Sequence, residues 1–152
     1  MGKTFEQKLY YSSIAALIFA LVSMPNVYKY TNSVFDGLTK DNCPTPLGKV
    51  VHGLVFLALN FAVMKWMNSR KPHHMQKPDG LLFKYAIYGT LVYYLLSDND
   101  TYILTSQAVG NVSGLRLANA VGCPSGAGVA VHSVVYALSL VGLMSLPKDS
   151  VY

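Results

Sequence analysis

Residues 43–52 read CPTPLGKVVH and lead into a long apolar stretch, and residues 123–132 read CPSGAGVAVH and lead into another. The two stretches share the pattern C-P-[ST]-x-x-G-x-x-x-H at a spacing of 80 residues, and upstream of them Tyr28 and Tyr102 match at a spacing of 74. A Cys, Pro, Gly and His that recur at the same spacing indicate a duplication. We therefore predict an internal repeat, in which each half is a helix, a long loop, a C-P turn and a second helix.

The composition is typical of a chain that lies in a membrane. Hydrophobic residues make up 52% of the sequence and charged residues only 12%, about half the share in soluble domains. Four uncharged or nearly uncharged segments approach the roughly 20 residues that a bilayer crossing needs. We predict an all-α membrane protein with four transmembrane helices arranged as two tandem helical hairpins. The four segments are residues 9–28, 50–64, 81–96 and 127–146.

Two alternatives to this fold stay open at the level of sequence. One is a soluble four-helix bundle with unusually apolar helices, because runs of 10–14 apolar residues also occur in cores. The other is a cleaved signal peptide in the first segment, which the lack of a small-x-small site after Val22 disfavours. The segment 50–64 is the weakest span, since it crosses only if Lys49 and Lys65 extend toward the interface.

The charges predict both the domain boundaries and the orientation. The predicted parts are a first hairpin at 1–66, a basic linker at 67–80 and a second hairpin at 81–152. Residues 65–84 carry a net charge of +4 and the tail before Leu9 carries +1, whereas the long loops 29–49 and 98–116 carry +1 and −1. By the positive-inside rule, both termini and the basic linker are predicted on the cytoplasmic side. The two long loops are then predicted on the opposite side.

The repeated residues predict contacts between helices. The prolines suit the first turn of a helix, which would place Cys43 and Cys123 beside the N-caps. The glycine and histidine of each copy lie four residues apart and so share one helix face. Glycine there allows another backbone to approach, and histidine can hydrogen-bond across the contact. The predicted contact residues are Pro44, Gly48, His52, Pro124, Gly128 and His132.

The cysteines leave two interpretations open. Cys43 and Cys123 form a disulfide on the non-cytoplasmic side if their Cα atoms lie within about 7 Å, or they are two reduced residues at helix starts. A zinc site is disfavoured because Cys43 and His52 would be about 13 Å apart along a helix. No C-x-x-C motif or acid–base constellation is present. We therefore expect no metal, no cofactor and no enzymatic activity.

One stretch carries a family resemblance. Residues 25–33 (PNVYKYTNS), followed by Cys43-Pro44-Thr45, Gly48 and His52 ahead of an apolar helix, resemble small multi-pass membrane proteins of nucleocytoplasmic large DNA viruses, the group that includes algal chloroviruses. The resemblance covers about residues 9–66 and recurs more faintly in 81–146. It implies a virion membrane protein or minor capsid protein that links an internal membrane to an icosahedral shell of double jelly-roll proteins.

The expected function is therefore structural. The partners would be the lipid bilayer, the major and other minor capsid proteins, and a second copy of the chain, with the two long loops forming one platform. Nucleic acid is not expected, because no element shows a row of Lys and Arg with interleaved aromatic residues. The alternative is a small transporter or channel built from two parallel repeats. That alternative predicts a polar path, for which Asn60 is the only amide well inside a predicted span.

Overall fold

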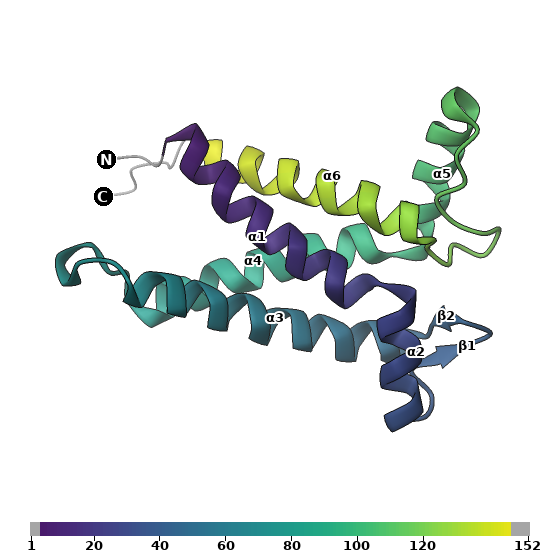
Figure 1. Ribbon diagram of the computed structural model, residues 1–152, viewed down its shortest axis with the longest axis horizontal. Helices are drawn as coiled ribbons and strands as arrows, with labels where there is room; N and C mark the ends of the chain where they lie inside the picture. Colours follow the sequence, from purple (N-terminus) through teal and green to yellow (C-terminus); the bar gives the residue numbers. More distant parts are fainter. Residues whose placement is uncertain (1–3, 147–152) are drawn as a thin grey trace.

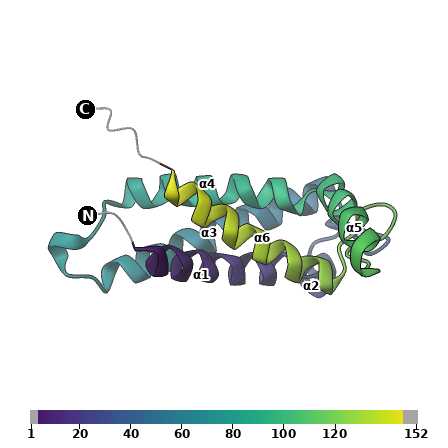
Figure 2. The same cartoon turned by 90° about the horizontal axis from the view of Figure 1, so that it is seen from above.

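The computed structural model describes residues 4–146, which form a bundle of four long helices with smaller elements gathered at one end (Figure 1). Figure 2 shows the same bundle from above. Lys3, Lys148 and Asp149, which entered the predicted charge balance, lie outside the described residues. The elements are α1 (Phe5–Ser23), α2 (Pro25–Val34), β1 (Thr39–Lys40), β2 (Cys43–Pro44), α3 (Pro46–Ser69), a 3-10 turn η1 (His73–Met75), α4 (Asp79–Ser97), α5 (Asn99–Ser113) and α6 (Gly126–Ser145).

The first predicted segment is not one straight helix. Helix α1 starts at a capping box formed by Thr4 and Gln7 and ends at Ser23, and α2 then departs at an angle of 55°. The break falls at Pro25, which has no N–H to continue the helix but suits the first position of a new one. Residues 9–28, predicted as a single crossing, are therefore bent near their C-terminal end.

The two predicted long loops are also more structured than expected. Residues 29–49 contain most of α2 and the antiparallel strands β1 and β2, and residues 98–116 contain α5. Helix α5 ends at Gly114, which adopts a left-handed conformation with φ of 71°. In Figure 1, α2, α5 and the hairpin all lie at the end of the bundle opposite to η1. We call this group the platform, and it comprises residues 25–44, which include α2, β1 and β2, and residues 99–125, which include α5.

Two helices, α3 and α6, are long and apolar enough to cross a membrane, each with a mean hydropathy of 1.8 over its most apolar window. The bent pair of α1 and α2 qualifies as a third span if it is counted as one. The fourth predicted span, α4, does not qualify by this measure, because it contains Asp79, Lys84 and four tyrosines. Helix α3 has 24 residues and extends well beyond the predicted segment 50–64.

Four aromatic rings fill the centre of the bundle, one from each long helix. Phe19 stacks on Tyr136 with 5.0 Å between ring centroids, and Phe56 stacks on Tyr93 at 4.6 Å. Edge-to-face contacts join Phe19 to Tyr93 at 5.4 Å and Phe56 to Tyr136 at 5.8 Å. All four side chains have an exposed fraction of 0%. The ring of contacts therefore connects every long helix to two others.

The two predicted hairpins are interlocked. The most extensive packing of α1 is against α6, and that of α3 is against α4. Contacts of α1 with α3, and of α4 with α6, are smaller. The long helices of each predicted half thus pack more extensively against the other half than against each other, and the described residues share a core cluster to which all four long helices contribute.

The outside of the bundle carries many large apolar side chains, while several small polar side chains are buried inside it. Ser12, Asn60 and Thr90 are buried, while large aliphatic side chains on all four long helices are exposed. Many exposed large apolar side chains on one protein are typical of a surface that contacts a membrane or a partner. Buried small and polar side chains are typical of helix contacts within membranes. The exposed aliphatic residues include Leu17, Leu21, Leu54, Leu59, Leu91, Leu95, Val134 and Leu138.

The aromatic centre predicts the effect of truncating one ring. We expect Phe56→Ala to lower the free energy of unfolding in detergent or bilayer by at least about 2 kcal/mol, because the stacked and edge-to-face contacts are lost and a cavity is left. The matched control is Leu54→Ala on the same helix, whose side chain is 59% exposed and should have little effect. Thermal unfolding followed by circular dichroism measures both. Equal losses in the two variants would contradict the assigned core.

Candidate functional site

The first candidate site is centred on His52, near the start of α3. The imidazole Nδ1 lies 2.8 Å from the backbone oxygen of Val22, and Nε2 lies 2.8 Å from the hydroxyl of Thr31. The phenol ring of Tyr28 stacks on the imidazole with 3.7 Å between centroids and 6° between planes. His52 therefore joins the end of α1 to α2 across the break between them.

The second candidate site is centred on His132, near the start of α6, and has the same geometry. Nδ1 lies 2.7 Å from the backbone oxygen of Leu96, and Nε2 lies 2.7 Å from the hydroxyl of Thr105. Tyr102 stacks on the ring at 3.9 Å and 8°. Each of these contacts matches one in the first site at the sequence spacing of 74 or 80 residues.

The hydrogen bonds of each imidazole involve both ring nitrogens. A carbonyl oxygen only accepts, so Nδ1 of His52 donates its proton to Val22. Nε2 lies 2.8 Å from the hydroxyl of Thr31, which itself donates to the backbone oxygens of Val27 and Tyr28 at 3.0 Å. The Val22 carbonyl belongs to the last turn of α1, where carbonyls lack partners within the helix. Both ring nitrogens therefore serve a structural role, as they also do in His132.

Gly48 allows a loop to touch the start of α3. A Cβ atom at this position would overlap the backbone oxygen of Leu38, which is buried. The hydroxyl of Thr45 accepts from the Gly48 N–H at 3.0 Å and lies 2.7 Å from the Gly37 oxygen, to which it donates. Thr45 is thus the N-cap of α3 and anchors the loop at the same time.

The same arrangement occurs at the start of α6. A Cβ at Gly128 would overlap the oxygen of Leu117, and Ser125 caps the helix by accepting from the Gly128 N–H at 3.1 Å. The hydroxyl of Ser125 also bonds the Leu117 oxygen at 2.9 Å. Gly48, His52, Gly128 and His132 therefore all lie at contacts between segments.

The prediction for the prolines was wrong by two residues. Pro44 lies in β2, and Pro124 forms an isolated bridge with Ala118. The first helical positions belong to Pro46 and Gly126 instead, because the hydroxyls of Thr45 and Ser125 supply the caps. Sequence reasoning missed this role, although the shared [ST] position of the motif carried the signal.

The structure joins Cys43 and Cys123 as a disulfide, with 5.2 Å between their Cα atoms. The bond closes a separation of 80 residues and connects β2 to the loop before α6. Cys123 is further held by its N–H, which donates to the side-chain oxygen of Asn119 at 2.9 Å. The two parts of the platform are therefore covalently linked.

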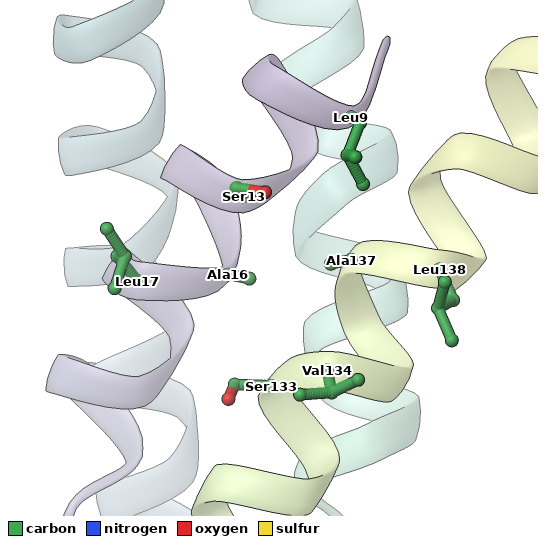
Figure 3. A pocket seen from close by; sticks show the side chains of 8 residues that line it. All are labelled: Leu9, Ser13, Ala16, Leu17, Ser133, Val134, Ala137 and Leu138. Atoms are coloured by element: carbon green, nitrogen blue, oxygen red, sulfur yellow. The ribbon is translucent and has the colours of Figure 1, made fainter. Parts of the chain in front are cut away.

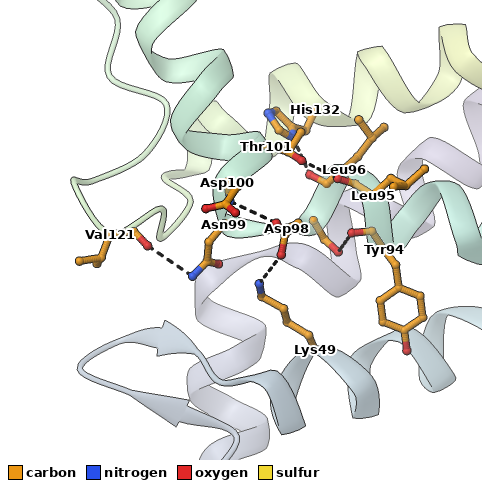
Figure 4. Close-up of polar contacts among 11 residues, drawn as sticks. Lys49, Tyr94, Leu95, Leu96, Asp98, Asn99, Asp100, Thr101, Val121 and His132 are labelled. Carbon is orange, nitrogen blue, oxygen red and sulfur yellow. Dashed lines mark hydrogen bonds and ion pairs between the residues drawn. The ribbon is translucent and has the colours of Figure 1, made fainter.

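A network of polar contacts around Asp98 links the two predicted halves (Figure 4). Unlike the histidine sites, this network is not duplicated in the repeat. Its carboxylate lies 3.2 Å from Nζ of Lys49 and accepts from the N–H of Asp100 at 3.3 Å. Burial alone would raise the pKa of Asp98, but the hydrogen bond and charge of Lys49 outweigh burial and lower that pKa. Asn99 in turn donates to the Val121 oxygen at 3.3 Å. These contacts hold α5 and the following loop against α3.

A shallow apolar groove of about 390 Å³ runs between α1 and α6 (Figure 3). Small side chains such as Ser13, Ala16 and Ala137 form its floor, and exposed aliphatic side chains form its rims. On the face between α3 and α4, Tyr94 contacts Gly53 and donates to the Val50 oxygen at 3.1 Å. The groove therefore belongs to the apolar outer surface.

Among residues 4–146, no three His, Cys, Asp or Glu side chains are grouped so that they could hold a metal ion. No family model matches the chain, and neither a curated protein nor a solved structure does.

The close approach at Gly48 predicts a specific sensitivity. We expect Gly48→Ala to lower the free energy of unfolding by about 1–3 kcal/mol, because the added methyl displaces the Leu38 carbonyl from the start of α3. The control is Gly142→Ala in α6, where an added Cβ meets no described atom within 4 Å. That variant should change stability by less than about 1 kcal/mol. Thermal unfolding of both variants decides the matter, and tolerance of Gly48→Ala would contradict the assigned contact.

Proposed function

We propose that this chain is a structural membrane protein composed of two tandem repeats, α1–α2–α3 and α4–α5–α6, that together cross the bilayer four times. The matched sites at His52 and His132 carry the proposal. Each uses the same carbonyl, hydroxyl and aromatic partners at a constant sequence spacing. The central rings follow the same rule, since Phe19 matches Tyr93 and Phe56 matches Tyr136.

The packing of α4 supports its inclusion as a fourth crossing. Tyrosine lowers the hydropathy of this helix, yet the ring of Tyr93 is buried at the bundle centre and the hydroxyl of Tyr94 is bonded to α3. From residue 81 onward, the exposed positions of α4 are mostly apolar and include one tyrosine and, near the start of the helix, one lysine: Phe83, Lys84, Ile87, Tyr88, Leu91 and Leu95. The surface that α4 would offer to lipid is therefore more apolar than its average composition.

The platform supports a docking role. The disulfide and the matched histidine sites connect its parts, so its loops are held on a rigid support. Tyr30, Phe35 and Val112 are exposed on the platform. Aromatic residues such as Tyr30 and Phe35 are enriched at protein interfaces. The motif resembles virion proteins of large DNA viruses, and this resemblance favours a capsid protein as the partner. We propose that the chain is a minor capsid component that links an internal membrane to major and other minor capsid proteins.

The arrangement of the core favours a scaffold over a transporter or channel. A transport path between the halves would need polar groups or water at the centre of the bundle. The centre is instead filled by Phe19, Phe56, Tyr93 and Tyr136. Asn60 lies beside Gly89, and its buried amide is part of a helix contact.

A topology measurement tests the four crossings. His74 and Gln107 are exposed residues on either side of α4. In sealed membrane vesicles we expect a membrane-impermeant maleimide to label either His74→Cys or Gln107→Cys, but not both, because α4 separates them. The parent chain is the control, since its two cysteines are bonded to each other. Labelling of both variants from one side would contradict the crossing of α4.

Crosslinking in virions tests the proposed role. If particles of the source virus contain the chain, we expect an amine-reactive crosslinker to join Lys40, which lies on the platform, to capsid proteins. Lys77 at the opposite end serves as the internal control and should yield no such crosslink. Crosslinks from Lys77 alone would place the basic end against the shell and contradict docking by the platform. Absence of the chain from purified particles would contradict the virion role altogether.

A further inference from the structure

The net positive charge of the described residues is confined to one end of the bundle. On and beside the platform, four cations are balanced by four carboxylates: Lys29, Lys40, Lys49 and Arg116 against Asp36, Asp41, Asp98 and Asp100. The other end has six cations and two carboxylates. The cations are Lys8, Lys65, Arg70, Lys71, Lys77 and Lys84, and the carboxylates are Glu6 and Asp79. This end, which we call the basic end, includes η1 and the adjoining helix ends (Figure 1). Its described residues carry a net charge of +4.

Most cations of the basic end are available to an external anion. Lys65 is paired with Asp79 at 2.7 Å. Within residues 4–146, the other five cations form no ion pair with a carboxylate. Several of them instead lie over aromatic rings. Arg70 lies 4.1 Å from the ring of Trp66, and Lys77 lies 5.0 Å from that of Tyr85.

The linker that carries these cations is held in one conformation. Asn68 is buried, and its side chain bonds Lys77 twice, donating to the backbone oxygen at 2.9 Å and accepting from the N–H at 3.0 Å. Gln76 donates to the Lys71 oxygen at 2.9 Å. These bonds close the linker between α3 and α4. The backbone that carries Lys71 and Lys77 is therefore folded before any ligand binds, which reduces the entropy lost on binding.

We propose that the basic end binds the phosphate groups of anionic phospholipids in the adjacent leaflet. The cations follow the ends of α1, α3 and α4, where the apolar outer surface begins, and they are interleaved with Tyr11, Trp66 and Tyr85, as in an interfacial aromatic belt. A leaflet contacts all these helix ends at once, which favours lipid over a protein that reaches only the tip. Basic clusters beside a span attract anionic lipid. The inference rests on the proposed membrane insertion.

Nanodiscs that contain the full chain test the proposal. Discs are made with equal amounts of phosphatidylglycerol and phosphatidylcholine, and native mass spectrometry measures which lipid stays bound. We expect phosphatidylglycerol to be preferred. The variant Arg70→Gln/Lys71→Gln/Lys77→Gln should lower this preference by at least about tenfold, because each basic residue near an anionic surface contributes roughly a fivefold factor. The matched control, Lys29→Gln/Lys40→Gln/Arg116→Gln, removes the same charge from the platform and should keep the preference.

The outcomes separate this inference from the proposed function. Failure of the parent chain to enter nanodiscs would overturn membrane insertion itself. Insertion with an equal preference in the parent chain and the basic-end variant, or an equal loss in both triple variants, would overturn only the lipid site. Displacement of lipid by inorganic phosphate or by duplex DNA at matched phosphate concentration would also overturn it. If the triple variant does not fold, the parent chain at about 0.5 M salt replaces it, where screening should remove the preference.

Discussion

The hydrogen bond between a histidine and the last turn of a helix is the constraint on which much of the structure depends. Helices α1 and α4 end abruptly before α2 and α5, and each end leaves carbonyl groups without partners. Near a bilayer such groups are costly because little water reaches them. His52 satisfies the Val22 carbonyl, and His132 satisfies that of Leu96. The chain can therefore turn sharply at the edge of the bundle.

The other features of the platform follow from that arrangement. Tyr28 and Tyr102 stack on the histidines and bring α2 and α5 against α3 and α6. Once these helices are in place, the loops after them pass close to Gly48 and Gly128. The disulfide then joins the two loops across the bundle. The repeated motif contains Cys and His, which also occur in metal and catalytic sites, but here it connects helices to one another. Its polar groups are occupied by these structural hydrogen bonds.

The two ends of the bundle differ in physical character. The platform is charge-balanced, cross-linked and contains short helices, which suits a defined protein contact. The basic end has excess cations beside aromatic rings, which suits a leaflet rich in phosphate. Between them, exposed aliphatic side chains surround a core of four aromatic rings. This division fits the proposed role, in which the long helices lie in a bilayer and the platform contacts a protein.

The sequence by itself determined the helical class, the apolar character and the positions of Gly48, His52 and their matches, because periodic apolar runs and a repeated motif are local signals. The sequence also identified Cys43 and Cys123 as candidates for a disulfide. Only the tertiary structure decided the rest. The bend at Pro25 follows from local chemistry, yet its angle depends on what α2 packs against. The roles of Leu38 and Leu117 were hidden because they act through backbone oxygens, which any residue carries. The pairing of α1 with α6, and of α3 with α4, depends on how four aromatic rings from distant segments fit together.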